Sequence, residues 1–176
     1  MPPYTTRKLR FLHRATVRVH MKTFQTVLIL LFLSSSPECA ASWFGMVVGV
    51  TDGDTITVMH RGKPEVIRLF GIDCPEKDQD FGTRAKQFTS YMAFRKIVEV
   101  VPIGETSYGR PVAWVFVNGR SLNKELVRAG LAWWYRRYAP HESELAQLEA
   151  VARKNQIGLW SHPNPVPPWE FRRFSR

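Results

Sequence analysis

A succession of short strand patterns, separated by turn residues, constrains the fold of this chain more than any other feature. Residues 54–60 alternate in polarity and place Ile56 and Val58 on one face, as in a half-buried strand. The pair Arg61-Gly62 follows and predicts a hairpin turn into a return strand. The predicted strands cover residues 45–50, 54–60, 64–70, 97–101 and 110–117.

Three helices are predicted between and after these strands. In the first, Ala85, Phe88 and Met92 recur on one helical face. In the second, Ser121 is a suitable N-cap and Gly130 a suitable stop. The predicted helices cover residues 81–95, 121–129 and 141–155. This order of elements predicts a β-rich α+β fold: a small closed antiparallel barrel with three α-helices at one end. Five short strands fit an OB-fold barrel, a frequent platform for oligonucleotides.

Residues 1–41 have the pattern of an N-terminal extension that ends in a secretory signal peptide. The apolar run from Thr26 to Leu33 is too short to span a bilayer, which takes about 20 residues. Small residues follow it up to a suitable cleavage point after Ala41. The acid-free basic stretch before Met21 indicates either an unusually long basic region of the signal or a true start at Met21, which we favour. An uncleaved anchor is the alternative; cleavage would leave no membrane span and a periplasmic or extracellular protein.

The rest of the chain divides into a domain at 42–160 and a tail at 161–176. Four prolines in the tail argue against regular structure, and its aromatic residues indicate that it packs back on the domain. Alternatively, these aromatics and the arginines between them could stack on bases and contact phosphates. The net charge of +10 favours a polyanionic partner: nucleic acid, acidic lipid or acidic polysaccharide.

Three carboxylates are predicted to converge beside the hairpin. Folding the chain about Arg61-Gly62 places Asp54 opposite roughly residue 70, and Asp73 and Glu76 follow shortly after. Acids this close repel each other unless a cation lies among them. Hard oxygen ligands on short loops suit Ca²⁺ or Mg²⁺.

Arginines accompany these acids. Arg68 alternates with Val66 and Phe70, so we expect it on the barrel-facing side of its strand, where it needs a partner. That partner is either a structural acid or a substrate phosphate. Arg110 opens another strand, and two arginines with a metal ion would clamp a phosphate. Glu76 would then be left to take a proton from water, so the residues indicate phosphodiester hydrolysis.

Four segments resemble the staphylococcal nuclease (thermonuclease) family, in the order and spacing of that family. They are DGDT at 52–55, IRLFGIDCPE at 67–76, YGR at 108–110 and LNKELVRAGLAWWYRRY at 122–138. The resemblance extends from about Val47 to Trp160. It implies an OB-fold barrel with three helices and a Ca²⁺-dependent endonuclease that cleaves DNA and RNA, single strands readily, and leaves 3′-phosphates.

The same resemblance implies roles for individual residues. Asp54, Asp73 and the backbone carbonyl of Cys74 would ligate Ca²⁺, although Mg²⁺ or Mn²⁺ would also suit oxygen ligands. Glu76 would act through a water molecule as the general base. The residues implied to hold and stabilise the phosphate are Arg68 and Arg110, and those near the substrate are Tyr108, Tyr138 and Arg136. We expect a monomer.

The chain departs from the family pattern at three positions. Cys74 stands where the family has Thr, which leaves a backbone ligand intact but adds a thiol that could respond to Zn²⁺ or oxidation. Ser107 replaces a lysine, and Arg136 replaces the first of two tyrosines near the base pocket. These departures bear on substrate preference more than on catalysis.

Two other functions compete with a nuclease. A non-catalytic OB module would bind nucleic acid without cleaving it. Such a module could lose any of five residues that are all present here: Asp54, Arg68, Asp73, Glu76 and Arg110. A polyanion or membrane-surface binder driven by charge would bind in a salt-sensitive manner without metal dependence.

Overall fold

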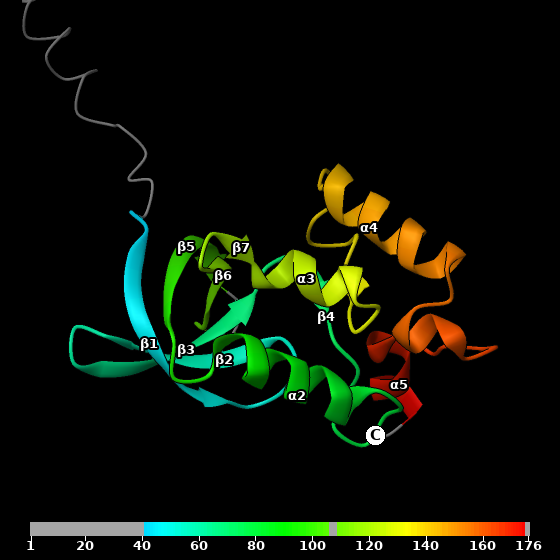
Figure 1. Cartoon of the computed structure of the whole chain (residues 1–176), viewed down its shortest axis with the longest axis horizontal. Coiled ribbons are helices and arrows are strands. Elements are labelled where there is room, and N and C mark those ends of the chain that lie inside the picture. Colours follow the sequence, from blue (N-terminus) through cyan, green and yellow to red (C-terminus); the bar gives the residue numbers. More distant parts are fainter. Residues whose placement is uncertain (1–40, 106–108, 175–176) are drawn as a thin grey trace, which may run out of the picture. The chain divides into compact units, whose positions relative to one another are not determined.

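The computed structural model describes residues 41–105 and 109–174 (Figure 1). The predicted signal segment therefore lies outside the described residues, apart from Ala41. The described residues form one compact unit. Its elements are β1 (Trp43–Val50), β2 (Thr55–His60), β3 (Lys63–Leu69), β4 (Ile72–Asp73), α2 (Gly82–Ala93), β5 (Ile97–Glu105), β6 (Pro111–Val117), β7 (Arg120–Ser121), α3 (Leu122–Arg128), β8 (Trp133–Trp134), α4 (Ser143–Lys154), the 3₁₀ helix η1 (Gly158–Ser161) and α5 (Pro168–Phe174).

The predicted hairpin between β2 and β3 is confirmed. Arg61 and Gly62 both have positive φ, 50° and 78°, as a two-residue hairpin turn of the favoured hand requires. The strands pair antiparallel from His60↔Lys63 to Thr55↔Arg68. This register sets Asp54, which directly precedes β2, opposite the end of β3.

Parallel pairing between β3 and β6 closes the sheet into a barrel. The strand order is β3-β2-β1-β5-β6-β7, and the two ends meet through the pairs Arg68↔Val112 and Leu69↔Ala113. Five long strands thus form the barrel, while β7 is a short addition and β4 pairs separately with β8. The predicted OB-type barrel is confirmed, but it is mixed and not purely antiparallel as predicted, because β3 and β6 pair in parallel. Strand β5 is longer than predicted because it continues past a register shift between Pro102 and Gly104.

Asn123 of α3 fastens this closure. Its side chain is fully buried and donates to the carbonyls of Phe70, at 2.9 Å, and Ala113, at 3.2 Å. Its Oδ1 accepts from the backbone N–H of Val115, at 3.1 Å. One amide therefore links the chain just after β3 to β6, and so fixes the strand ends that carry the candidate site.

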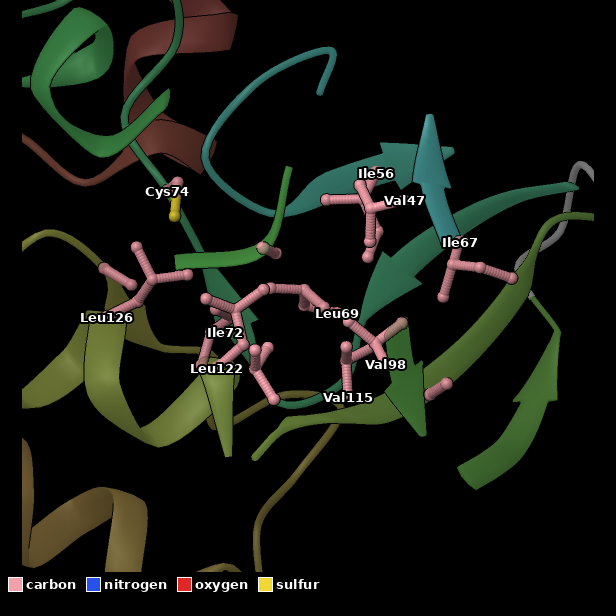
Figure 2. Packing of buried hydrophobic residues seen from close by; sticks show 14 of the residues in the cluster. Val47, Ile56, Ile67, Leu69, Ile72, Cys74, Val98, Val115, Leu122 and Leu126 are labelled. Carbon is pink, nitrogen blue, oxygen red and sulfur yellow. The ribbon is translucent and has the colours of Figure 1, made fainter. Parts of the chain in front are cut away.

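The barrel interior is filled by aliphatic side chains from alternate strand positions (Figure 2). Ile67 and Leu69 of β3 point inward and are almost completely buried, as are Ile56 and Val115. A second, smaller cluster contains Trp133 and Trp160 with residues of α4 and η1. The expectation that at least one of the adjacent tryptophans at 133 and 134 packs in the core is thereby confirmed.

The helices match the predictions except at the C-terminus. Helices α2, α3 and α4 occur where expected, and Ser121 caps α3 by accepting from the N–H of Lys124 at 3.4 Å. The prediction that the tail lacks regular structure is wrong, because residues 168–174 form α5. All four prolines precede or begin this helix, and proline is well tolerated in a first helical turn. No helix within residues 41–105 and 109–174 has the length and apolar character needed to cross a membrane.

Candidate active site

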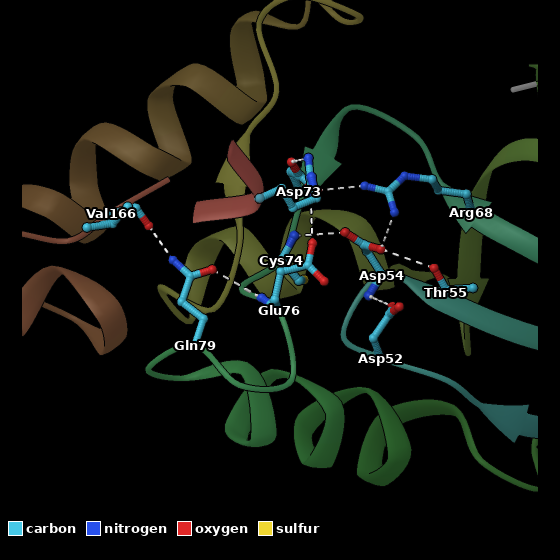
Figure 3. Close-up of polar contacts among 10 residues, drawn as sticks. Asp52, Asp54, Thr55, Arg68, Asp73, Cys74, Glu76, Gln79 and Val166 are labelled. Carbon is cyan, nitrogen blue, oxygen red and sulfur yellow. Dashed lines mark hydrogen bonds and ion pairs between the residues drawn. The ribbon is translucent and has the colours of Figure 1, made fainter. Parts of the chain in front are cut away.

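Asp54, Arg68 and Asp73 form an ion-pair cluster at one end of the barrel (Figure 3). The Nη1 atom of Arg68 lies 2.8 Å from Oδ1 of Asp54, and its Nη2 atom lies 2.6 Å from Oδ1 of Asp73. Both carboxylates are buried, with exposed fractions of 2% and 0%. One guanidinium thus bridges two acids that come from different turns of the chain.

Arg68 does not lie on the barrel-facing side of β3, so that prediction is wrong. Its neighbours Ile67 and Leu69 are the inward-pointing residues, whereas Arg68 is partly exposed and Val66 is exposed. The strand does alternate as predicted, but Ile67 and Leu69 fill the barrel interior in place of Val66 and Phe70. Arg68 is consequently able to reach both the buried carboxylates and the solvent.

Further donors hold the Asp54 carboxylate in place. The backbone N–H of Cys74 donates to its Oδ2 at 2.7 Å, and the Thr55 hydroxyl donates to its Oδ1 at 3.2 Å. Burial raises the pKa of Asp54 to about 7, since the opposing effect of Arg68 is outweighed and the charges of Asp52 and Asp73 add to the rise. A further cation nearby would stabilise the ionised form of this carboxyl.

The turn that presents Asp54 depends on close packing at Gly53. A Cβ atom at this position would lie 2.7 Å from the Cβ and Sγ atoms of Cys74 and 2.8 Å from the Cβ of Ala85. The Thr89 hydroxyl also donates to the Gly53 carbonyl, at 2.6 Å. Ala85 and Thr89 of α2 therefore hold the turn in place, and only glycine at position 53 allows the turn to pack this closely against Cys74 and α2.

Cys74 contributes its backbone to the site and its side chain to the core. The thiol is 4% exposed and belongs to the main apolar cluster. Burial, together with the nearby acids, raises its pKa well above the ordinary value. A buried, protonated thiol is a weak metal ligand and a slow nucleophile, so the structure argues against the predicted sensitivity to Zn²⁺ or oxidation.

Glu76 lies next to this cluster on the more open side. Its side chain is 40% exposed, and its backbone N–H donates to Oε1 of Gln79 at 3.1 Å. Its Oε1 atom lies 2.6 Å from Nη1 of Arg172. Glu76 is thus the most accessible of the three clustered carboxylates, as a proton acceptor for water would have to be.

Arg110 lies in the segment that leads into the strand beside Arg68. It directly precedes β6, whose Val112 pairs with Arg68, so the barrel closure brings the two chain segments together. Tyr108 lies outside the described residues.

Arg136 and Tyr138 follow β8, which pairs with β4 at Asp73↔Trp133. Tyr138 is 64% exposed, whereas the Arg136 guanidinium covers the Trp134 ring at 4.8 Å from its centroid. A cavity of about 400 Å³ beside this segment is lined by residues of β8, α4 and α5, Arg136 among them. Both residues therefore lie on the chain segment that neighbours the carboxylates.

Arg172 of α5 was not predicted as a site residue. Its Nη2 atom lies 2.7 Å from Oδ2 of Asp73, and its Nη1 atom contacts Glu76. This pairing joins positions that are far apart in the sequence, so no local pattern reveals it. The only available sign was the run of arginines among aromatics in the tail.

The three carboxylates have the chemistry of a site for a hard divalent cation. Shared guanidinium groups bring them together: Arg68 joins Asp54 to Asp73, and Arg172 joins Asp73 to Glu76. Within the described ranges, no three His, Cys, Asp or Glu side chains are gathered closely enough to hold one ion, because the arginines lie between the acids. The donor set fits Ca²⁺ if the Arg172 guanidinium gives way.

Comparisons with known proteins agree with this geometry. The family model described as staphylococcal nuclease homologue matches residues 66–162. An uncharacterized endonuclease of Escherichia coli O157:H7 is 41% identical over 145 residues, which cover 82% of this chain and 94% of that protein. Micrococcal nuclease of Shigella flexneri is 37% identical over 146 residues, covering 77% of this chain and 84% of that protein. The chain therefore belongs to the staphylococcal nuclease family and is an endonuclease-like hydrolase.

Proposed function

We propose that this protein is an exported, calcium-dependent endonuclease that hydrolyses phosphodiester bonds in DNA and RNA. The observation that carries the proposal is the buried cluster of Asp54, Arg68 and Asp73 with Glu76 at its open side. A barrel that only bound nucleic acid would have no need to bury two carboxylates next to an accessible third. We further propose that single strands are preferred and that the products carry 3′-phosphates, as the family resemblance implies.

The metal ligands follow from the donor set. Asp54, Asp73 and the backbone carbonyl of Cys74 would hold Ca²⁺, with Glu76 close enough to contribute through water. A bound cation would stabilise the negative charge that develops on the reacting phosphate. Oxygen donors of this kind also accept Mg²⁺ or Mn²⁺, so the proposal of Ca²⁺ rests on the family resemblance.

The exposure of each side chain indicates which catalytic role it would take. Glu76, which is 40% exposed, would take the proton from the attacking water. Arg68, whose side chain is 22% exposed, would donate to a phosphate oxygen while its carboxylate partners keep it oriented. Arg110 would be the second donor to the phosphate. Donors that are fixed before the substrate arrives need no reorganisation when charge develops.

Export is proposed from the sequence of residues 1–41, in which an apolar run and small residues precede a suitable cleavage point. The chain after residue 41 keeps 19 Lys and Arg against 14 Asp and Glu, a net charge of +5, and this basic excess supports a nucleic-acid substrate because it attracts polyanions over a distance. The exposed Tyr138 and Arg136 are proposed to contact bases or phosphates beside the reacting bond.

The test is cleavage of single-stranded DNA by three preparations: the purified protein with Ca²⁺, the protein with EDTA, and Glu76→Gln with Ca²⁺. We expect cleavage by the first alone. Glu170→Gln is the matched control, because it makes the same chemical change on an exposed residue of α5. Cleavage in EDTA would contradict metal dependence. Tight binding without cleavage in any preparation would favour a non-catalytic nucleic-acid-binding protein.

A further inference from the structure

Helix α5 inserts an arginine into the carboxylate cluster. Arg172 makes three polar contacts there: Nη2 to Oδ2 of Asp73 at 2.7 Å, Nη1 to Oδ1 of Asp73 at 3.3 Å, and Nη1 to Oε1 of Glu76 at 2.6 Å. Asp73 is 0% exposed, so Arg172 and Arg68 together surround a buried carboxylate. The Arg172 guanidinium faces the oxygens that a cation would use.

The position of α5 is fixed by contacts of residues that precede Arg172 in the chain. The Trp169 ring stacks on Tyr135, with centroids 5.1 Å apart and an interplanar angle of 5°, and packs edge-on against Trp133 at 5.6 Å. Just before the helix, the Val166 carbonyl accepts from Nε2 of Gln79 at 2.5 Å. These contacts hold the helix without help from Arg172.

The Arg172 side chain itself is less confined. It is 38% exposed, so its guanidinium can rotate into solvent while Trp169 keeps the helix in place. A guanidinium remains charged at every accessible pH, and its charge repels a divalent cation at the carboxylates that it contacts. Arg172 therefore competes with a metal ion for Oδ2 of Asp73 and Oε1 of Glu76, two atoms that Arg68 does not contact.

We propose that Arg172 is a built-in competitor of the divalent cation: it neutralises Asp73 and Glu76 in the metal-free protein and must leave before the metal binds. This inference rests on the proposed metal dependence of the site. By linkage, whatever Arg172 contributes to the metal-free state is subtracted from the affinity for the cation. Removing its charge should therefore tighten Ca²⁺ binding by about fivefold to thirtyfold, a typical size for coupling between two binding events.

The experiment is a calorimetric titration of Ca²⁺ into the metal-free, full-length protein in the absence of nucleic acid. The variants are Arg172→Gln and Arg172→Lys, and Arg173→Gln is the matched control because it removes the same charge from the exposed neighbouring residue. We expect tighter Ca²⁺ binding in Arg172→Gln, an intermediate effect in Arg172→Lys, and less than a twofold change in Arg173→Gln.

Thermal unfolding gives a second readout. Without metal, Arg172→Gln should melt at a lower temperature than the unmodified protein, because two carboxylates lose a partner; at saturating Ca²⁺ the difference should disappear. Equal or weaker Ca²⁺ affinity in Arg172→Gln would overturn the inference and leave the proposed function intact. Absence of binding of Ca²⁺, Mg²⁺ and Mn²⁺ by all four proteins would overturn both.

Discussion

Replacing Asn123 by alanine should destabilise the protein strongly, because its side chain is fully buried and bonds only to backbone groups. The change removes three hydrogen bonds that join the end of β3 to β6. Each contributes about 1 kcal/mol net, and a buried N–H or carbonyl that loses its partner costs about 1–3 kcal/mol. Because Ala113 keeps its bond from the N–H of Phe70, at 2.8 Å, we expect a loss of about 3–5 kcal/mol in the free energy of unfolding.

The assay is urea unfolding in EDTA, followed by circular dichroism, with Asn164→Ala as the control because Asn164 is exposed in the tail. The control should change the free energy of unfolding by no more than about 0.5 kcal/mol. The slope of the transition should be the same in all three proteins, since the surface exposed on unfolding is unchanged. A loss below about 1 kcal/mol for Asn123→Ala would refute the reasoning, because the three bonds would then contribute almost nothing.

The remaining predictions concern the charged cluster and its thiol. Arg68→Ala should lower the rate of DNA cleavage by about 100-fold or more, because a phosphate donor is lost. It should also lower the urea midpoint of the metal-free protein, because Asp54 and Asp73 are left buried without the guanidinium that they share. A variant that kept more than about a tenth of the activity would contradict this role of Arg68. Because the pKa of Asp54 is raised to about 7, a metal ion must displace a proton from Asp54 below that pH. Ca²⁺ affinity should therefore fall by up to about tenfold for each pH unit below about 7 and level off above it. An affinity that did not change with pH from about 5.5 to about 8 would be inconsistent with a protonated Asp54. Cys74 should react with a disulfide reagent about 100-fold more slowly in the native protein than in urea, because the thiol is buried and its pKa raised; rapid native labelling would show that the turn at Gly53 opens readily.

The individual strands and the hairpin were predictable from the sequence because their signals are local. Arg61-Gly62 defines the hairpin, and the hairpin register then sets Asp54 opposite the end of β3, as found. The face on which Arg68 lies could not be assigned in this way, because a strand of alternating residues has two faces and only packing shows which one is interior. Ile67 and Leu69 fill the barrel, so Arg68 faces outward.

The C-terminal helix and its arginine were missed for related reasons. A count of prolines over the tail predicted irregular structure, but the last of them, Pro168, begins α5 and leaves the following residues free to be helical. The contact of Arg172 with Asp73 depends on the complete fold. Asn123 was missed in the same way, since all three of its partners are backbone groups, in β6 and just after β3, which no side-chain pattern reports.

The parallel pairing of β3 with β6 also determines when the site can exist during folding. The hairpin that carries Asp54 and Arg68 involves neighbouring segments and can form early, whereas the pairs Arg68↔Val112 and Leu69↔Ala113 require the chain to return from the far side of the sheet. Contacts of high sequence separation form late, because a long loop must close before they are gained. A chain whose closing pairs have not yet formed therefore holds Asp54 and Arg68 on the hairpin without an ordered Arg110 beside them. The complete arrangement of acids and arginines exists only in the finished barrel.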